Sequence, residues 1–247
     1  MTKYVLFDTE TTGNQDEDRI IQIGAMLVGA KGNVEVYDEL CSASIPIKVE
    51  AMEVHNITPE VIEGKAPFTS TRFWNDLSTL NSESNYLIAH NIKFDLGMLE
   101  KEGFVNKMKL IDTLRCAKHL FPESDYHRLQ YFRYSLGLYK KEQEEARKYN
   151  ITIKAHDVIG DVLVMKLFLS ELVKKVKEKF PNMNPMVKLE ELTYTPVMLQ
   201  SFKFGKYKGE RIDDIARSDA GYIKWMLKSL ELDEDLKYTL ERVLENV

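Results

Sequence analysis

Three short segments of this chain place carboxylates, and one histidine, where they could carry out metal-dependent chemistry. The first is FDTETTG at 7–13, in which Asp8 and Glu10 stand two residues apart. On a strand, this spacing points both side chains to the same side. Adjacent carboxylates repel one another, so burying them without a cation is costly. A hard divalent ion such as Mg²⁺ relieves the repulsion, because it prefers oxygen ligands.

The other two segments lie further along the chain. AHNIKFD at 89–95 places Asp95 at the opening of a predicted helix, just after a buried strand, where α/β proteins build their sites. AHDVIGD at 155–161 places Asp161 in a strongly apolar helix, five residues after His156. Mid-helix residues at this spacing would point about 140° apart. We therefore expect His156 at the helix start or in the preceding loop, free to turn toward the site.

Together, these residues suit hydrolysis of a phosphodiester with two bound metal ions. One metal would activate a water molecule and the other would stabilise the leaving oxygen. The histidine would accept the proton from that water. Each segment alone also has an ordinary structural explanation. Asp8 and Glu10 would then be a solvent-facing pair, Asp95 a helix cap, Asp161 part of a solvated helix face and His156 a capping or surface residue.

The elements that must position these residues follow from the hydrophobic pattern. Apolar runs predict strands at 4–8, 20–28, 34–41, 86–90 and 109–112. Thr58 and Pro59 indicate a helix start, and further helices are predicted over 68–80, 94–101 and 156–179. Three strands followed by alternating helices and strands predict a mixed α/β sheet. The polar stretch 120–155 allows no assignment.

The last part of the chain is predicted to form a separate module. Residues 180–196 contain three prolines and two asparagines, which indicates a linker after a first domain at 1–179. Residues 197–247 then predict a small α+β module, with a hairpin at SFKFGKYKGER followed by two helices. Aromatic residues alternate there with Lys203, Lys206, Lys208 and Arg211, as at nucleic-acid contacts. A small aromatic core beneath a solvated basic hairpin is the alternative.

Composition sets broad limits. The net charge of −5 disfavours a nucleic-acid binder only weakly, because bound metals would supply positive charge locally. Cys41 and Cys116 form no CxxC pattern, so we expect buried thiols in a reducing compartment. The chain begins without a signal peptide and has no run of eighteen apolar residues. We therefore expect a cytoplasmic protein that does not bind membranes.

The three motifs FDTETTG, AHNIKFD and the His-x4-Asp of HDVIGD, in this order, resemble those of the DnaQ-like (DEDDh) family of 3′–5′ exonucleases. EAMEVHNIT at 50–58 is similar to the family segment that contacts the terminal nucleotide. The likeness covers about residues 1–178, with Asp157-Val158 in place of the commoner Arg-Ala type of pair. The segment FKFGKYKGERIDDIARSDAGYIKWML resembles the small C-terminal domain of exonuclease X-like proteins.

This resemblance implies an RNase H-like fold and assigns roles to residues. Asp8, Glu10, Asp95 and Asp161 would hold two Mg²⁺ or Mn²⁺ ions, with His156 as general base. The resemblance implies contacts to the 3′-terminal nucleotide, and the residues concerned are Thr11, Glu50 and His55. For His55, the alternative is a packing residue at a helix start.

The implied reaction is stepwise hydrolysis of DNA, at a single-stranded 3′ end or a duplex end, to nucleoside 5′-monophosphates. An exoribonuclease and a proofreading subunit of a polymerase remain alternatives, so RNA is a possible substrate and a protein partner is left open. A nucleic-acid-binding module with a dead site is a further alternative, but it predicts a missing carboxylate or histidine, and none is missing.

Overall fold

The computed structural model describes residues 1–29, 32–153 and 157–245. The chain forms two compact units, the first unit at Met1–Thr193 and the second unit at Tyr194–Val247. Each has its own hydrophobic core. Among the described residues, no helix is long and apolar enough to cross a membrane. Both cysteines, Cys41 and Cys116, are buried free thiols.

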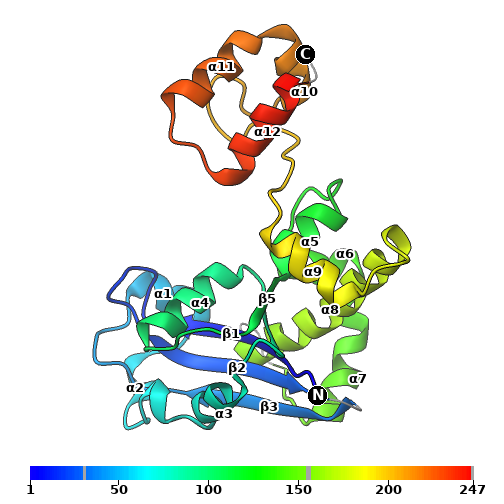
Figure 1. Ribbon diagram of the computed structural model, residues 1–247. Coiled ribbons are helices and arrows are strands. Elements are labelled where there is room, and N and C mark those ends of the chain that lie inside the picture. Colours follow the sequence, from blue (N-terminus) through cyan, green and yellow to red (C-terminus); the bar gives the residue numbers. More distant parts are fainter. Residues whose placement is uncertain (30–31, 154–156, 246–247) are drawn as a thin grey trace. The chain divides into compact units, whose positions relative to one another are not determined.

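A five-stranded mixed sheet forms the centre of the first unit, in the order β3-β2-β1-β4-β5 (Figure 1). Strands β1, β2 and β3 pair antiparallel, whereas β4 runs parallel to both β1 and β5. This confirms the predicted mixed sheet, and two strands have the bounds expected from sequence. The strands are β1 (Tyr4–Thr11), β2 (Ile20–Val28), β3 (Val34–Leu40), β4 (Tyr86–Ala89) and β5 (Lys109–Asp112).

Helices cover both faces of this sheet, because alternate residues of β1 face opposite layers. Leu6 packs in the core with the long helix α8 (Val158–Lys179), and Val5 and Phe7 pack in the core on the other face. Helices α5 (Thr113–Leu120), α6 (Leu129–Ser135) and α9 (Pro185–Tyr194) contribute to the α8 layer. The opposite layer contains η2 (Phe68–Ser70), α3 (Arg72–Leu80) and α4 (Ile92–Lys101).

Three further helices complete the first unit: α1 (Val49–His55), α2 (Pro59–Ile62) and α7 (Tyr139–Tyr149). Helices α6 and α7 lie within the stretch that the sequence left unassigned. The buried carboxylate of Glu142 on α7 accepts two hydrogen bonds from the Arg133 guanidinium on α6, at 2.5 and 2.6 Å. Such a bidentate pair fixes the geometry of the two helices.

The start of α8 lies close to the sheet because β2 carries a glycine at the crossing point. A Cβ atom on Gly24 would lie 2.9 Å from the backbone nitrogen of Ile159 and from the carbonyl carbon of Val158. No side chain fits there without moving the helix. Gly24 is also the partner of Asp8 in the β1–β2 register, so this close approach brings the first turn of α8 next to Asp8.

The structure differs from the predicted linker at 180–196. Residues 185–194 form α9, and the first unit extends to Thr193. Leu189 and Leu192 are buried in the α8 layer, and the Thr193 hydroxyl accepts a hydrogen bond from the backbone N–H of Asp112 at 2.9 Å. Pro185 stands at the first position of this helix, where proline is well tolerated, so it starts a helix rather than breaking one.

The second unit is helical, with α10 (Ile212–Ser218), α11 (Ala220–Ser229) and α12 (Glu234–Glu245). The predicted hairpin is instead a turn closed by a single antiparallel bridge between Ser201 and Arg211. Phe202 is buried in the core with Ile212, Ile223 and Leu240. This core comes entirely from the second unit, which agrees with the compactness of that unit.

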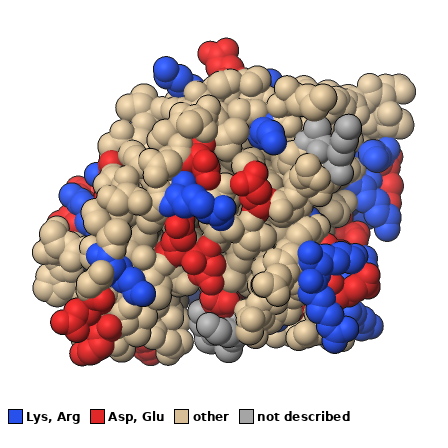
Figure 2. Space-filling view, turned by 90° about the horizontal axis from the view of Figure 1, so that it is seen from below, with Lys and Arg blue, Asp and Glu red and all other residues tan. Residues whose placement is uncertain are grey.

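On the face shown in Figure 2, basic and acidic side chains lie in small neighbouring groups rather than in one area of a single sign. This matches the composition, with 34 basic and 39 acidic residues. The face therefore lacks the broad basic patch that marks many nucleic-acid-binding surfaces.

Candidate active site

Asp8 and Glu10 lie near the end of the central strand. They follow Leu6 at alternate positions of β1, and Leu6 packs in the α8 layer, so the two carboxylates lie on the side of the sheet that α8 covers. Strand β4 pairs with β1 only from Tyr4 to Leu6. The end of β1 therefore projects past β4, and its polar groups are available to the helix that follows β4.

Asp95, in the first turn of that helix, is buried and anchored to β1. One of its carboxylate oxygens accepts hydrogen bonds from the backbone N–H of Thr9 at 3.1 Å and from the Thr9 hydroxyl at 2.7 Å. The turn leading to α4 is fixed by Asn91, which has φ 74°, and whose N–H donates to the Asp112 carboxylate at 3.0 Å. Asp95 is therefore held beside β1 and is not a helix cap.

Asp161 approaches the site from the first turn of α8. It is partly buried, and the side-chain amide of Gln130 on α6 donates a hydrogen bond to it at 2.5 Å. Asp8 and Asp161 line one cavity of about 160 Å³, together with His90, Leu129 and Met165. The structure thus brings the carboxylates of β1, α4 and α8 into one region of the first unit.

Burial and mutual repulsion disfavour the ionised form of these carboxylates, and their raised pKa values reflect this. Burial raises the pKa of Asp8 well above its ordinary value, and the charges of Asp95, Glu10 and Asp161 raise it further. Burial also raises the pKa of Glu10 to about 7, with contributions from Asp161 and Asp95. Burial raises the pKa of Asp95 to about 7 despite its hydrogen bonds from Thr9. Unshielded carboxylates in a partly buried site would be expected to behave in this way.

No three His, Cys, Asp or Glu side chains among the described residues are arranged to hold one metal ion as they stand. Asp95 accepts hydrogen bonds from Thr9, and Asp161 accepts one from Gln130, so one oxygen of each carboxylate is bonded to a protein donor. The donor set nevertheless fits a hard divalent cation, because it consists of carboxylate oxygens whose mutual repulsion such an ion would relieve.

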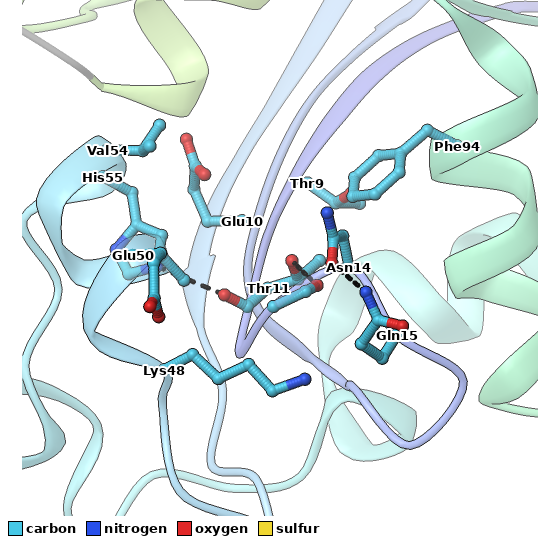
Figure 3. Close-up of a pocket in the computed structure, with 12 residues that line it drawn as sticks. Thr9, Glu10, Thr11, Asn14, Gln15, Lys48, Glu50, Val54, His55 and Phe94 are labelled. Atoms are coloured by element: carbon cyan, nitrogen blue, oxygen red, sulfur yellow. Dashed lines mark hydrogen bonds between the residues drawn. The ribbon is translucent and has the colours of Figure 1, made fainter.

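A larger pocket of about 570 Å³ opens beside Glu10, within the range of small-molecule sites of about 300–1,000 Å³. Phe94 on α4 and Val54 on α1 lie on opposite sides of it, with Glu10 between them (Figure 3). Both apolar side chains are exposed, Phe94 by 37% and Val54 by 64%. The remaining lining residues are Thr9, Thr11, Gly13, Asn14, Gln15, Lys48, Glu50, Ala51 and His55.

The three residues expected to contact a terminal nucleotide all line this pocket. Glu50 is exposed in the first turn of α1. The ring of His55 is buried, and its Nδ1 accepts from the backbone N–H of Ile57 at 2.9 Å. Its Nε2 therefore carries the proton and donates to the carbonyl of Thr11 at 3.2 Å. Burial lowers the pKa of His55, which favours this neutral form.

His55 is the last residue of α1, whereas the packing alternative placed it at a helix start. Both ring nitrogens bond to the backbone, so the histidine fixes the end of β1. The hydroxyl of Thr11 donates to the carbonyl of Gly13 at 2.6 Å, which bends the chain into the following loop.

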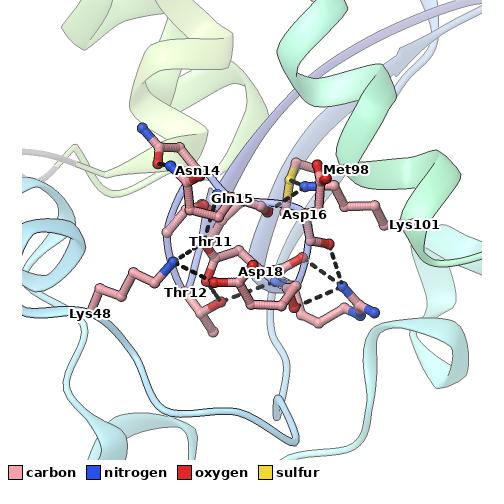
Figure 4. A network of polar contacts seen from close by, with 12 residues as sticks. Thr11, Thr12, Asn14, Gln15, Asp16, Asp18, Lys48, Met98 and Lys101 are labelled. Carbon is pink, nitrogen blue, oxygen red and sulfur yellow. Dashed lines mark hydrogen bonds and ion pairs between the residues drawn. The ribbon is translucent and has the colours of Figure 1, made fainter.

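That loop is held by an ion pair whose acidic partner is buried and by a set of polar contacts (Figure 4). Asp18 is fully buried and accepts hydrogen bonds from Lys48 at 2.7 Å, from the Gln15 backbone N–H at 2.7 Å and from the Thr12 hydroxyl at 2.8 Å. On the other side of the loop, Lys101 donates to the carbonyl of Gln15 at 2.6 Å. Asn14 and Gln15 are thereby fixed at the pocket wall.

An Asp18→Ala variant is expected to destabilise the protein by about 1–3 kcal/mol, because it removes the acceptor of the buried Thr12 hydroxyl and of the Gln15 and Lys48 donors. Burial raises the pKa of Asp18, but the bonds from Lys48, Gln15 and Thr12 outweigh it and hold the pKa below its ordinary value of 3.8. A depressed pKa contributes stability above the ordinary value that is lost as pH falls through the folded one. Urea unfolding should therefore show a larger stability difference between wild type and variant at neutral pH than at strongly acidic pH. An equal difference at both would contradict this account.

His156 lies outside the described residues, so its predicted role as general base stays a prediction. The sequence did not reveal Phe94, Val54 or Gln130 as site residues. Phe94 directly precedes Asp95, but an exposed aromatic residue in a helix has no distinctive spacing. Gln130 lies in the stretch left unassigned, and only the packing of α6 on α8 brings it to Asp161.

Comparisons with known proteins agree with this geometry. The family model described as "Exonuclease" matches residues 5–164, and the one described as "Exodeoxyribonuclease X-like C-terminal" matches residues 202–231. The chain is 27% identical over 247 residues to exodeoxyribonuclease 10 of Escherichia coli K12, covering 98% of both chains. It is 32% identical over 183 residues to the DNA polymerase III subunit epsilon of Treponema pallidum, covering 71% of this chain and 79% of that one.

Two solved structures share the fold. Exonuclease X, in complex with 5′ overhanging duplex DNA, superposes with a TM-score of 0.54 at 19% identity, covering 77% of this chain and 99% of that chain. Exonuclease I of Methylocaldum szegediense superposes with a TM-score of 0.53 at 18% identity, covering 74% of this chain and 42% of that one. At these identities, the likeness establishes the RNase H-like fold of the first unit.

Proposed function

Because this chain belongs to the exonuclease family, whose model spans residues 5–164, we propose that it hydrolyses DNA stepwise from the 3′ end and releases nucleoside 5′-monophosphates. The observation that carries the proposal is the convergence of four carboxylates. Asp8, Glu10, Asp95 and Asp161 come from three elements of the first unit. Besides burial, the charges of Asp95 and Asp161 raise the pKa values of Asp8 and Glu10 beside an open pocket.

Each of these residues has a proposed task. The four carboxylates would hold two Mg²⁺ or Mn²⁺ ions. When bound, these ions would supply the Lewis acidity that activates water and stabilises the leaving oxygen. A ring nitrogen of His156 would accept the proton of the attacking water. Gln130 and Thr9 would keep Asp161 and Asp95 oriented, since they already bond to those carboxylates.

The pocket beside Glu10 would receive the terminal nucleotide. Phe94 and Val54 offer two apolar surfaces on opposite sides, between which a base could stack. Glu50 would accept a hydrogen bond from the sugar, and Thr11 would offer its backbone or hydroxyl to the same nucleotide. His55 is a positioning residue in this scheme, because its ring holds the Thr11 carbonyl.

DNA is the proposed substrate because the chain aligns along 98% of its length with a relative named exodeoxyribonuclease 10. That alignment includes the second unit, which supports an enzyme that acts without a polymerase. The test is digestion of 5′-labelled DNA and RNA oligomers side by side, with and without Mg²⁺. A ladder of DNA products shortening from the 3′ end, with 5′-monophosphates released, is expected. Endonucleolytic fragments or cleavage of RNA alone would overturn the proposal.

A Phe94→Ala variant is expected to bind the terminal nucleotide less tightly. Loss of one base–aromatic contact costs about 1–3 kcal/mol, so KM for a short DNA oligomer should rise by about 5- to 150-fold. The turnover number should change little, because Phe94 touches none of the reacting atoms in this scheme. Steady-state kinetics measures both quantities. Val105→Ala, at a side chain that is 74% exposed and does not line the pocket, is the matched control. A fall in kcat at unchanged KM would contradict the stacking role.

A further inference from the structure

The second unit contains a row of aromatic rings, only part of which is buried in its hydrophobic core. Tyr222 on α11 lies at the centre, with its ring centroid 6.0 Å from Phe202, 5.0 Å from Tyr207 and 5.6 Å from Trp225. Phe202 is buried at 2% exposure, whereas Trp225 at the other end is 50% exposed. The row therefore runs from the core to the surface and presents a large ring to solvent.

A basic turn, residues 203–208, packs against this row. Lys206 lies over the Tyr207 ring, with Nζ 4.5 Å from its centroid, and is paired with Asp219 at 3.2 Å. Gly205 has φ 79°, and a Cβ atom there would lie 2.5 Å from the Tyr222 hydroxyl. Only glycine allows this close approach. The turn is thus fixed to the aromatic row, and its exposed Phe204 adds a second ring to the surface.

The charges of the second unit are unevenly distributed along its sequence. Residues 202–211 and 220–229 together contain six lysines and arginines and one acidic residue, Glu210. The rest of the unit, residues 194–201, 212–219 and 230–247, contains three basic and nine acidic residues. Lys228 follows Trp225 by three positions on α11, so the two share a helix face. Exposed rings and exposed cations therefore occupy the same two segments.

We propose that this face of the second unit binds a single strand of nucleic acid. One base would stack on Trp225 and a neighbouring base on Phe204, with phosphates at Lys203, Lys206 and Lys208. Stacking is the contact that every base can make, and cations beside the rings suit the backbone. This inference rests on the proposed function in one respect: the bound strand is the substrate of the active site.

The structure refines the contacts expected from the sequence. Lys203 and Lys208 are exposed and make no ion pair with a described residue. Arg211 is 3.3 Å from Asp213 and Lys206 is 3.2 Å from Asp219, so these two cations are less available than Lys203 and Lys208. Phe202 belongs to the core, as the alternative of a small aromatic core predicted, but Trp225 and Phe204 do not. A protein partner would not require lysines around exposed rings, whereas a polyanion with stacking bases requires both.

The test is DNA binding by the 247-residue chain in EDTA, which prevents metal-dependent cleavage. Fluorescence anisotropy of a labelled oligothymidylate gives the affinity across a range of salt concentrations. Trp225→Ala should weaken binding by about 5- to 150-fold, the equivalent of about 1–3 kcal/mol per stacked base. Trp225→Phe should retain most of the affinity. The matched control is Tyr238→Ala on α12, an aromatic residue outside this face.

A second variant tests the phosphate contacts. Replacing both Lys203 and Lys208 by glutamine should reduce the slope of log affinity against log salt by about 1.4, at about 0.7 per phosphate on a single strand. Lys237→Gln on α12 is the control and should leave the slope unchanged. Circular dichroism of each variant establishes that the helices remain.

The outcomes separate this inference from the proposed function. Hydrolysis of the p-nitrophenyl ester of thymidine 5′-monophosphate with Mg²⁺ reports on the first unit alone, because the substrate is too small to span a stacking surface. Trp225→Ala should leave that rate unchanged. A wild-type chain without this activity would count against the proposed function, whatever the binding data show. Unchanged DNA affinity in both variants would overturn the present inference. If the variants then sediment differently from wild type, the face binds a second copy of the chain.

Discussion

An Asp8→Asn variant is expected to show no measurable DNA cleavage while keeping its fold. Asp8 lies on the central strand, and its burial together with the charges of Asp95, Glu10 and Asp161 raises its pKa, so it lies within the group of carboxylates. Metal ions at such sites contribute several kcal/mol of transition-state stabilisation, which corresponds to at least about a thousandfold in rate. Digestion of an end-labelled oligomer, followed to long times, measures the loss.

The same variant should be more stable than wild type when metal is absent. The folded pKa of Asp8 is raised above its ordinary value of 3.8, so the folded chain binds this proton more tightly than the unfolded chain. Stability from Asp8 is therefore present at low pH and lost as pH rises above that ordinary value. In EDTA near neutral pH, the asparagine variant should melt at a higher temperature, with a weaker pH dependence. Asp16→Asn, in the exposed loop, is the control. Wild-type turnover in the Asp8 variant would refute the metal assignment.

His156→Ala is expected to lose turnover by about 10²–10⁴-fold, the usual contribution of a general base, while retaining metal and DNA binding. The expectation comes from the sequence, since His156 precedes the start of α8 by two residues and Asp161 by five. Calorimetric titration with Mn²⁺ and single-turnover kinetics measure the two effects separately. His119→Ala, on α5, serves as a control. If metal affinity falls as far as the rate does, the histidine is a ligand and not a base.

Local patterns in the sequence were sufficient to predict the sheet and the three elements that carry the site carboxylates, β1, α4 and α8. β2 and β5 have the predicted bounds, because each is an apolar run ended by turn residues or by a carboxylate. The mixed topology also follows from the order of the elements. In contrast, α1 is not predicted, because VEAMEVH is only seven residues long and has no clear helical spacing of apolar residues. The helix is maintained by tertiary contacts, such as the buried His55, that no local pattern reveals.

The predicted linker failed for a related reason. Proline and asparagine commonly end helices and strands, but here Pro185 starts a helix, and Leu189 and Leu192 form one apolar face at a spacing of three residues. The side chains that orient the carboxylates were likewise invisible to spacing arguments. Thr9 on β1 contacts Asp95, which lies 86 residues away in the sequence, and Gln130 on α6 contacts Asp161, which lies 31 residues away.

The central position of β1 has a consequence for how the protein is made. The strand is complete at Thr11, yet its neighbour β4 begins at Tyr86 and the helix that covers it begins at Val158. During synthesis, the N-terminus leaves the ribosome first. The apolar residues of β1 therefore stay partly uncovered until most of the first unit has been synthesised. Contacts between such distant residues also slow folding. The last carboxylate of the site arrives with Asp161, and α9 closes the core later still. A ribosome-bound fragment that ends before α8 therefore holds only part of the catalytic set, and full nuclease activity would begin only once the first unit is nearly complete.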